Sequence, residues 1–176
     1  MPAGSPPPPT SRVDVVGPML SLYADEASRA LTRDGRPVKH TFVSPTPVAH
    51  DRCCEGMVYS RIETVVPQTA PTPEGVRQVC EPHGFTLNLA VGVLRCASTI
   101  DSRGRPPSAQ RIADDGLMQA DDLQSLKDAI LGRDETRALG TWTPIPNEGG
   151  CVGGEWLFSV RVDNLRVPVP EPEPNG

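Results

Sequence analysis

The sequence predicts an α+β fold, in which a small, mostly antiparallel sheet carries two main helices packed on one face, with Pro-rich terminal extensions. Three segments support this prediction: an amphipathic helix over 108–131, an alternating strand over 85–96 and a hairpin over 141–162. The chain has 176 residues, which is enough for one domain with its own core. With only two Trp, two Tyr and three Phe, that core is expected to consist mainly of Val, Leu, Ile and Ala.

The first predicted helix covers about residues 14–32. Asp34-Gly35 provides a stop signal after it, and Pro18 falls in the first turn, where proline is tolerated. Its apolar residues recur at helical spacing, namely Val15, Val16, Met19, Leu20, Leu22, Tyr23, Ala27, Ala30 and Leu31. Residues 1–12 are assigned to a Pro-rich N-terminal tail, 13–163 to a single α+β domain, and 164–176 to a Pro-rich C-terminal tail.

Strands are predicted in the middle of the chain. A short one, Lys39 to Val43, lies in an otherwise loop-like region. Glu55 to Val66 is rich in β-branched and aromatic residues and stops before Pro67. In FTLNLAVGVLRC (85–96), large apolar residues alternate with smaller ones, so one face is apolar and the other carries small residues. A small-residue face allows a helix or another backbone to approach closely.

The second helix is predicted to begin after Ser108 as its N-cap and to end at Leu131, before Gly132. Its apolar stripe comprises Ala113, Leu117, Ala120, Leu123, Lys127 and Ile130, widened by Leu126 and Leu131. The acidic pairs Asp114-Asp115 and Asp121-Asp122 are interpreted as solvated helix surface. Adjacent helical residues point about 100° apart, so neither pair can face one ligand squarely.

The hairpin TWTPIPNEGGCVGGEWLFSVRV ends the folded part of the chain. Its glycines are interpreted as one loop, because glycine reaches positive φ without steric cost. They are Gly149, Gly150, Gly153 and Gly154. The loop lacks the Lys and Ser/Thr of a P-loop, and a strand follows it, so it is not a phosphate site. The strand after it places Trp156, Phe158, Val160 and Val162 on one face.

Two mirrored pairs with two-residue gaps are the candidate metal ligands, since such gaps suit one tetrahedral ion. They are His50 with Cys53 and Cys80 with His83. Three alternatives stay open: a zinc site, a disulfide from Cys53 or Cys54 to Cys80, and unlinked thiols. Cys96 and Cys151 flank apolar strands and are predicted to be small buried residues. No cofactor is predicted.

Composition and motifs argue against several classes of function. The formal net charge is −5 and only two of the 17 basic residues are lysines, which argues against wrapping nucleic acid. No apolar run is long enough to span a bilayer, and the N-terminus lacks the features of a secretory signal. A reducing cytoplasm is therefore the expected place of synthesis. No GxSxG elbow or comparable nucleophile motif occurs, and an enzyme is not predicted.

The chain resembles head-to-tail connector (neck) proteins of long-tailed actinobacteriophages of the siphovirus type, in particular tail terminators. The resemblance rests on CCEGMVYSRIETVVPQ (53–68), FTLNLAVGVLRC (85–96) and the helix plus hairpin ending in GGCVGGEWLFSVRV. It covers about residues 50–163. It implies a structural virion protein of the tail and neck that is assembled in the host cytoplasm. The vicinal Cys53-Cys54 and the Pro-rich tails are not matched by the general fold of that family.

The resemblance further implies a ring, expected to be a hexamer, that caps the tail tube, stops its polymerisation and joins it to the head. The expected partners are other copies of the chain, the tail tube protein and the head-to-tail connector or stopper protein. Genome DNA is expected to pass through the ring lumen without sequence-specific binding. The interface candidates are the four hairpin glycines and the Pro-rich loop with Pro67, Gln68 and Gly75.

Two other readings stay open. One is a head-to-tail stopper or adaptor of the same neck region, whose fold is expected to be mainly a small β-barrel. The predicted helix over 108–131 fits that fold less well than it fits a terminator. The other is a small cytoplasmic enzyme of unknown type, which would require a pocket with convergent polar residues.

Overall fold

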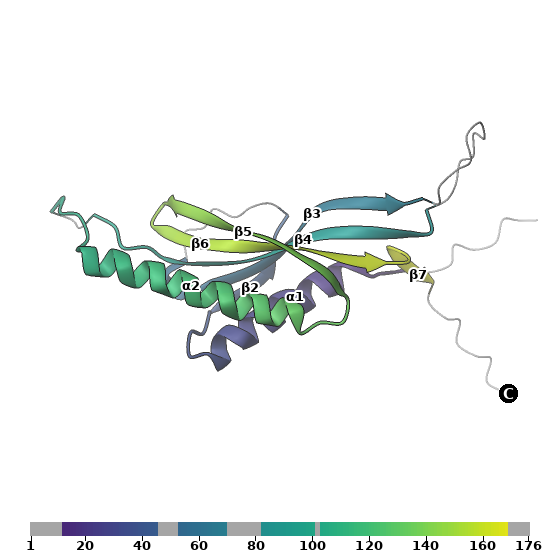
Figure 1. The fold of residues 1–176 in the computed structure, drawn as a ribbon, viewed down its shortest axis with the longest axis horizontal. Helices are drawn as coiled ribbons and strands as arrows, with labels where there is room; N and C mark the ends of the chain where they lie inside the picture. Colours follow the sequence, from purple (N-terminus) through teal and green to yellow (C-terminus); the bar gives the residue numbers. More distant parts are fainter. Residues whose placement is uncertain (1–11, 46–52, 70–81, 101–102, 169–176) are drawn as a thin grey trace, which may run out of the picture.

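The computed structural model describes residues 12–45, 53–69, 82–100 and 103–168, and it confirms the α+β class. Two helices pack against a five-stranded sheet of order β2-β3-β4-β6-β5 in an elongated molecule (Figure 1). Within the described part of the chain, β2 and β3 are the one parallel pair of this sheet, and its other pairs are antiparallel.

Within the described residues the chain forms two helices, seven strands and one 3-10 turn. They are β1 (Arg12–Asp14), α1 (Val16–Arg33), β2 (His40–Val43), the 3-10 turn η1 (Cys53–Glu55), β3 (Met57–Gln68), β4 (Gly84–Cys96), α2 (Ala109–Leu131), β5 (Thr136–Glu148), β6 (Cys151–Val162) and β7 (Arg166–Pro168). Both helices and the strands β2, β3, β4 and β6 lie within a few residues of their predicted places, β5 begins before the predicted hairpin, and β1, η1 and β7 were not predicted. β1 and β7 pair antiparallel in a second, two-stranded sheet, and β7 lies among the residues assigned to the C-terminal tail.

Local capping fixes where the two helices begin and end. The Asp14 carboxylate accepts hydrogen bonds from the N–H groups of Val16 and Gly17, at 3.0 and 3.1 Å, at the start of α1. Gly35, with a φ of +77°, follows its end. The Ser108 hydroxyl accepts from the N–H of Arg111 at 3.3 Å, which confirms the predicted N-cap of α2.

The main core lies between the helices and one face of the sheet. α1 packs on β2, β3 and β4, whereas α2 packs on β4, β5 and β6. The alternation predicted within 85–96 is confirmed, since the large residues at alternate positions from Leu87 to Val93 are buried in this core and Phe85 packs against it. The core includes Leu20, Tyr23, Ala27, Leu31, Leu87, Leu89, Val91, Val93, Leu126, Ile130, Phe158 and Val160. The Trp156 Nε1–H donates to the Leu123 carbonyl at 2.9 Å and ties β6 to α2.

The predicted apolar stripe of α2 is only partly correct, because members near both ends of the helix are exposed. Leu126 and Ile130 are buried, but Leu117 is 66% exposed and Leu131 is 53% exposed. Ala113 and Ala120 are exposed as well. For the N-terminal members the reason is geometric, because the first turns of α2 run past the β5–β6 turn (Figure 1), whereas Leu131 is the last residue of the helix. An apolar stripe read from the sequence does not show where the sheet beneath it ends.

The interpretation of Asp121-Asp122 as solvated surface holds for Asp121 and is wrong for Asp122. The Asp122 side chain is 2% exposed and receives hydrogen bonds from the guanidinium groups of Arg36 and Arg95. Arg36 also donates to the Ser125 hydroxyl at 2.6 Å, and that hydroxyl donates to Asp34 and lowers the pKa of the Asp34 carboxyl. The network joins α2 to β4 and to the chain after α1.

Candidate interaction surfaces

The β5–β6 turn contains two of the four glycines assigned to the hairpin loop. Gly149 and Gly150 have φ values of +59° and +83°, and Glu148 pairs with Cys151 across the turn. Positive φ at both central residues is the pattern of a type I′ turn, which matches the twist of the flanking strands. Both residues lie at the tip, and Gly149 is exposed. Their place in a hairpin loop is confirmed.

The other two glycines are buried inside β6, so their assignment to the loop is wrong. A Cβ atom on Gly153 would overlap the backbone carbonyl of Val93 in β4, and one on Gly154 would overlap the Trp142 indole ring. Gly92 has the same role, because the Tyr59 ring lies where its Cβ would be. These buried glycines therefore allow close packing inside the subunit and are not accessible to a partner protein.

The second set of interface candidates lies at the other end of the sheet. Pro67 is exposed near the end of β3, and Gln68 donates through Nε2 to the Thr86 hydroxyl at 2.9 Å. Gly75 lies outside the described residues. The end of β3 and the β5–β6 turn stand at opposite ends of the long axis of the molecule (Figure 1). The Gly149–Gly150 turn and the end of β3 therefore lie far apart on the subunit.

Two exposed apolar surfaces lie on the helix side of the subunit. The first, the α2 ridge, is one face of the N-terminal half of α2 and consists of Ile112, Ala113, Gly116, Leu117 and Ala120. The second, the β2–β3 groove, is a depression of about 360 Å³ lined by Leu20, Val43, Ser44, Pro45 and Ile62. α2 belongs to the β5–β6 half of the sheet and the groove to the β2–β3 half.

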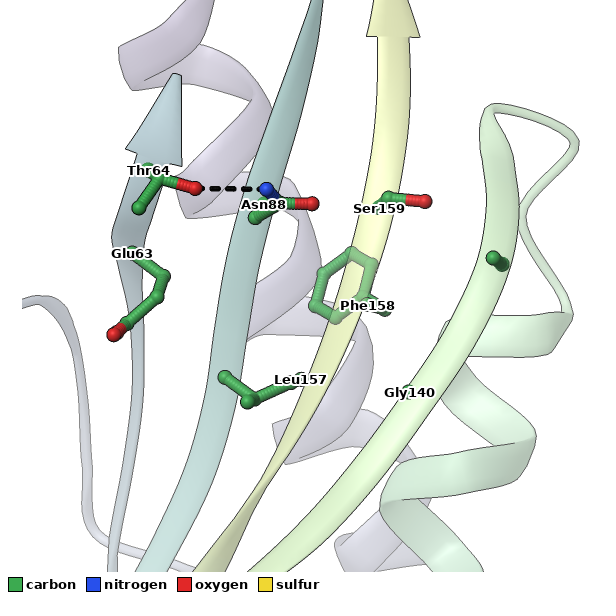
Figure 2. A pocket seen from close by; sticks show the side chains of 8 residues that line it. Glu63, Thr64, Asn88, Gly140, Leu157, Phe158 and Ser159 are labelled. Carbon is green, nitrogen blue, oxygen red and sulfur yellow. Dashed lines mark hydrogen bonds between the residues drawn. The ribbon is translucent and has the colours of Figure 1, made fainter. Parts of the chain in front are cut away.

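The face of the sheet turned away from α1 carries a depression of about 330 Å³ (Figure 2). Its floor includes Leu157, and Asn88 donates to the Thr64 hydroxyl at 2.7 Å across its rim. Its carboxylate, Glu63, is already bonded to the Arg61 guanidinium. Amide, hydroxyl and paired carboxylate groups of this kind suit a contact surface better than acid–base chemistry.

A buried ionic cluster lies beside this depression and joins β3 to β6 across β4. The Glu155 carboxylate accepts from Arg61 Nη2 at 2.6 Å and from the Tyr59 hydroxyl at 2.9 Å. The Arg61 and Glu155 side chains are 7% and 9% exposed. Burial, followed by the neighbouring Glu155 charge, raises the pKa of the Tyr59 hydroxyl well above its ordinary value of 10.0. The hydroxyl therefore remains a proton donor to Glu155.

Tyr59→Phe removes one donor to a buried carboxylate, and we expect it to lower the free energy of unfolding by about 1.5–3 kcal/mol at neutral pH. Because the pKa of Tyr59 is raised on folding, its contribution is complete below the ordinary value of 10.0 and is lost as pH rises toward the folded value. Urea unfolding should therefore show a smaller difference in the free energy of unfolding between wild type and variant above pH 10 than at pH 7. A difference that widens in alkali would contradict this account.

The cysteines form two disulfides, Cys53–Cys151 and Cys54–Cys96. The alternatives of a Cys80 disulfide and of unlinked thiols are therefore wrong for Cys53 and Cys54. The prediction of small buried residues is wrong for Cys96, which is exposed, and confirmed for Cys151, which is buried. The signal that sequence reading missed is the β4–β6 register, which places Cys96 opposite Cys151.

The proposed metal ligands are not brought together in the described part of the chain. Cys53 is bonded to Cys151. His83 is exposed beside the end of β3, where its backbone N–H donates to the Gln68 backbone carbonyl. His50 and Cys80 lie outside the described residues. Among the residues that are described, no group of three or more His, Cys, Asp or Glu side chains is placed to hold a metal ion.

No protein-family model matches the chain, and no curated protein is similar to it. No helix in the described ranges has both the length and the apolar character needed to cross a membrane. The functional argument therefore depends on the surfaces of the subunit itself.

Proposed function

We propose that the chain is a structural subunit of a phage neck, a tail terminator whose copies form a ring on the end of the tail tube. The observation that carries the proposal is the presence of two different apolar surfaces, the α2 ridge and the β2–β3 groove, on opposite halves of one subunit. A ring built by rotation repeats a head-to-tail contact, which requires two different surfaces on every subunit.

In this proposal the α2 ridge of one subunit seats in the β2–β3 groove of the next. Ile112 and Leu117 are 57% and 66% exposed, so both have apolar area left to bury. Fully burying a side chain of this kind contributes about 1.5–3 kcal/mol. The small residues Ala113, Gly116 and Ala120 let the helix backbone approach the groove closely, and the space around Gly116 is open.

The two ends of the subunit would then make the axial contacts. The Gly149–Gly150 tip and the end of β3 at Pro67 and Gln68 lie far apart on the subunit, so one is available to the tail tube and the other to the head connector (Figure 1). A net charge of −5 per subunit repels DNA phosphates, which suits a lumen through which the genome passes without being held.

Leu117→Asp is expected to prevent self-association while leaving the subunit folded. A charge placed at the centre of the α2 ridge would have to be desolvated in the groove, at a cost of several kcal/mol. Leu131→Asp is the matched control, because Leu131 is 53% exposed on the same helix but outside the ridge. Sedimentation velocity over a range of concentrations, with tail tubes present as a template, measures assembly, and urea unfolding measures stability. Equal loss of assembly in both variants would argue against the ridge contact.

The function itself is tested by tail tube polymerisation. Tube protein is assembled with and without the purified chain, and tube lengths are measured by negative-stain microscopy. A terminator should halt elongation and leave one end of each tube capped. Unchanged tube lengths together with binding to connector-bearing heads would favour the stopper instead. Binding to neither would refute a role in the neck.

A further inference from the structure

The cysteine cluster has a second possible pairing built into it. Cys53 and Cys54 are adjacent in η1, and their partners Cys96 and Cys151 are directly opposite each other in the β4–β6 register. The N–H of Ala97 donates to the Gly150 carbonyl at 2.7 Å, so that neighbouring pair is hydrogen-bonded. Cys96 and Cys151 thus occupy a non-hydrogen-bonded position, where cross-strand Cα atoms approach within the span of a disulfide.

The two existing disulfides differ in their access to solvent. Cys54 and Cys96 are both exposed, whereas Cys53 and Cys151 are 3% and 4% exposed. Thiol–disulfide exchange requires a thiolate to reach a sulfur atom directly. A small thiol in solution therefore reaches the Cys54–Cys96 bond and is kept from the Cys53–Cys151 bond by packing.

We propose that these four cysteines form a thiol-exchange site for small thiols of the glutathione class. In the first step an external thiolate attacks Cys54 Sγ, forms a mixed disulfide there and releases Cys96 as a thiolate. In the second step the Cys96 thiolate attacks Cys151 Sγ, the Cys96–Cys151 bond forms, and Cys53 leaves as a thiolate that takes up a proton from water. The number of disulfide bonds is unchanged in the second step.

The exchange changes which parts of the fold are cross-linked. The starting bonds tie η1 to the end of the β4–β6 pair beside the Gly149–Gly150 turn. The product links β4 to β6 and leaves η1 held by noncovalent contacts, among them the hydrogen bond from the Lys39 N–H to the Glu55 carbonyl at 3.1 Å. The inference does not depend on the proposed function, because it follows from register and exposure alone.

Peptide mapping of the full chain tests the exchange directly. Trypsin places both vicinal cysteines in the peptide 53–61, Cys96 in 96–103 and Cys151 in 138–161, so the starting protein yields one species of three linked peptides. After reduced glutathione and an N-ethylmaleimide quench, we expect 96–103 linked to 138–161 alone, with glutathione on Cys54. Separate, labelled 96–103 and 138–161 would overturn the exchange, and so would a three-peptide species that glutathione leaves intact.

A pair of variants isolates the role of Cys96. In Cys54→Ser the Cys96 thiol is free from the start, so the 53–61 to 138–161 link should be replaced by the 96–103 to 138–161 link without any added thiol. The double variant Cys54→Ser with Cys96→Ser lacks this internal nucleophile. We expect its 53–61 to 138–161 link to survive at least about tenfold longer, because an oriented intramolecular thiol acts at a high effective concentration. Equal lifetimes would overturn the proposal.

Discussion

Asp122→Ala is expected to lower the free energy of unfolding by about 2–4 kcal/mol, because it leaves two half-buried guanidinium groups without their common counter-ion. Asp122 is 2% exposed, and the Arg36 and Arg95 side chains that it pairs are 23% and 13% exposed. Arg95 also donates to the Arg36 backbone carbonyl at 2.9 Å, which fixes the Arg95 guanidinium beside the chain after α1. Urea unfolding followed by far-UV circular dichroism measures the loss.

Asp121→Ala is the matched control for that substitution. Its side chain is 66% exposed, and its nearest guanidinium contact, with Arg36, is 3.9 Å long. Exposed pairs of this kind contribute about 0.2–1 kcal/mol, so the control should stay close to wild type. If both variants lost stability equally, Asp122 would not be the counter-ion that holds α2 against β4 and the chain after α1.

Gly153→Ala is expected to lower the free energy of unfolding by about 3 kcal/mol or more, or to prevent folding. The added Cβ would overlap the Val93 carbonyl. Because this carbonyl belongs to the backbone of the neighbouring strand, it cannot move aside by a change of side-chain rotamer. The central β4–β6 pair would have to separate at this point. Soluble yield and urea unfolding give the measurement.

Gly116→Ala provides the opposite case with the same chemical change. Gly116 lies within α2, and nothing lies within 4 Å of the position that its Cβ would take. Replacing an unstrained helical glycine with alanine stabilises by roughly 0.5–1 kcal/mol. A stabilised Gly153→Ala variant would show that β6 does not pack against β4 as described.

The elements that sequence reading predicted well are those encoded by nearby residues. The strand over 84–96 follows from alternation, and the start of α2 follows from Ser108 as a cap, since both depend on neighbours within a few positions. The features that were missed depend on distant partners. Asp122 can be buried because Arg36 and Arg95 neutralise its charge. These two partners are 86 and 27 positions away in the sequence, so no local pattern predicts the burial.

The candidate site shows the same division. A two-residue hairpin turn requires positive φ at Gly149 and Gly150. This requirement depends only on neighbouring residues, and the sequence correctly predicts both glycines to lie in a turn. In the sequence, Gly153 cannot be distinguished from the two turn glycines. It must be glycine because the backbone of β4 lies where a Cβ atom would be. The cysteine pairing depends on β4–β6 register and on the position of η1, and both are set by the tertiary fold.

The most direct test of the account is negative-stain imaging of tail tubes mixed with the purified chain, with native mass measurement of the material that binds. The account predicts a closed ring on one end of each tube, lost with Leu117→Asp and retained with Leu131→Asp. Free monomers beside bare tube ends, or a cap that forms equally well with Leu117→Asp, would contradict it.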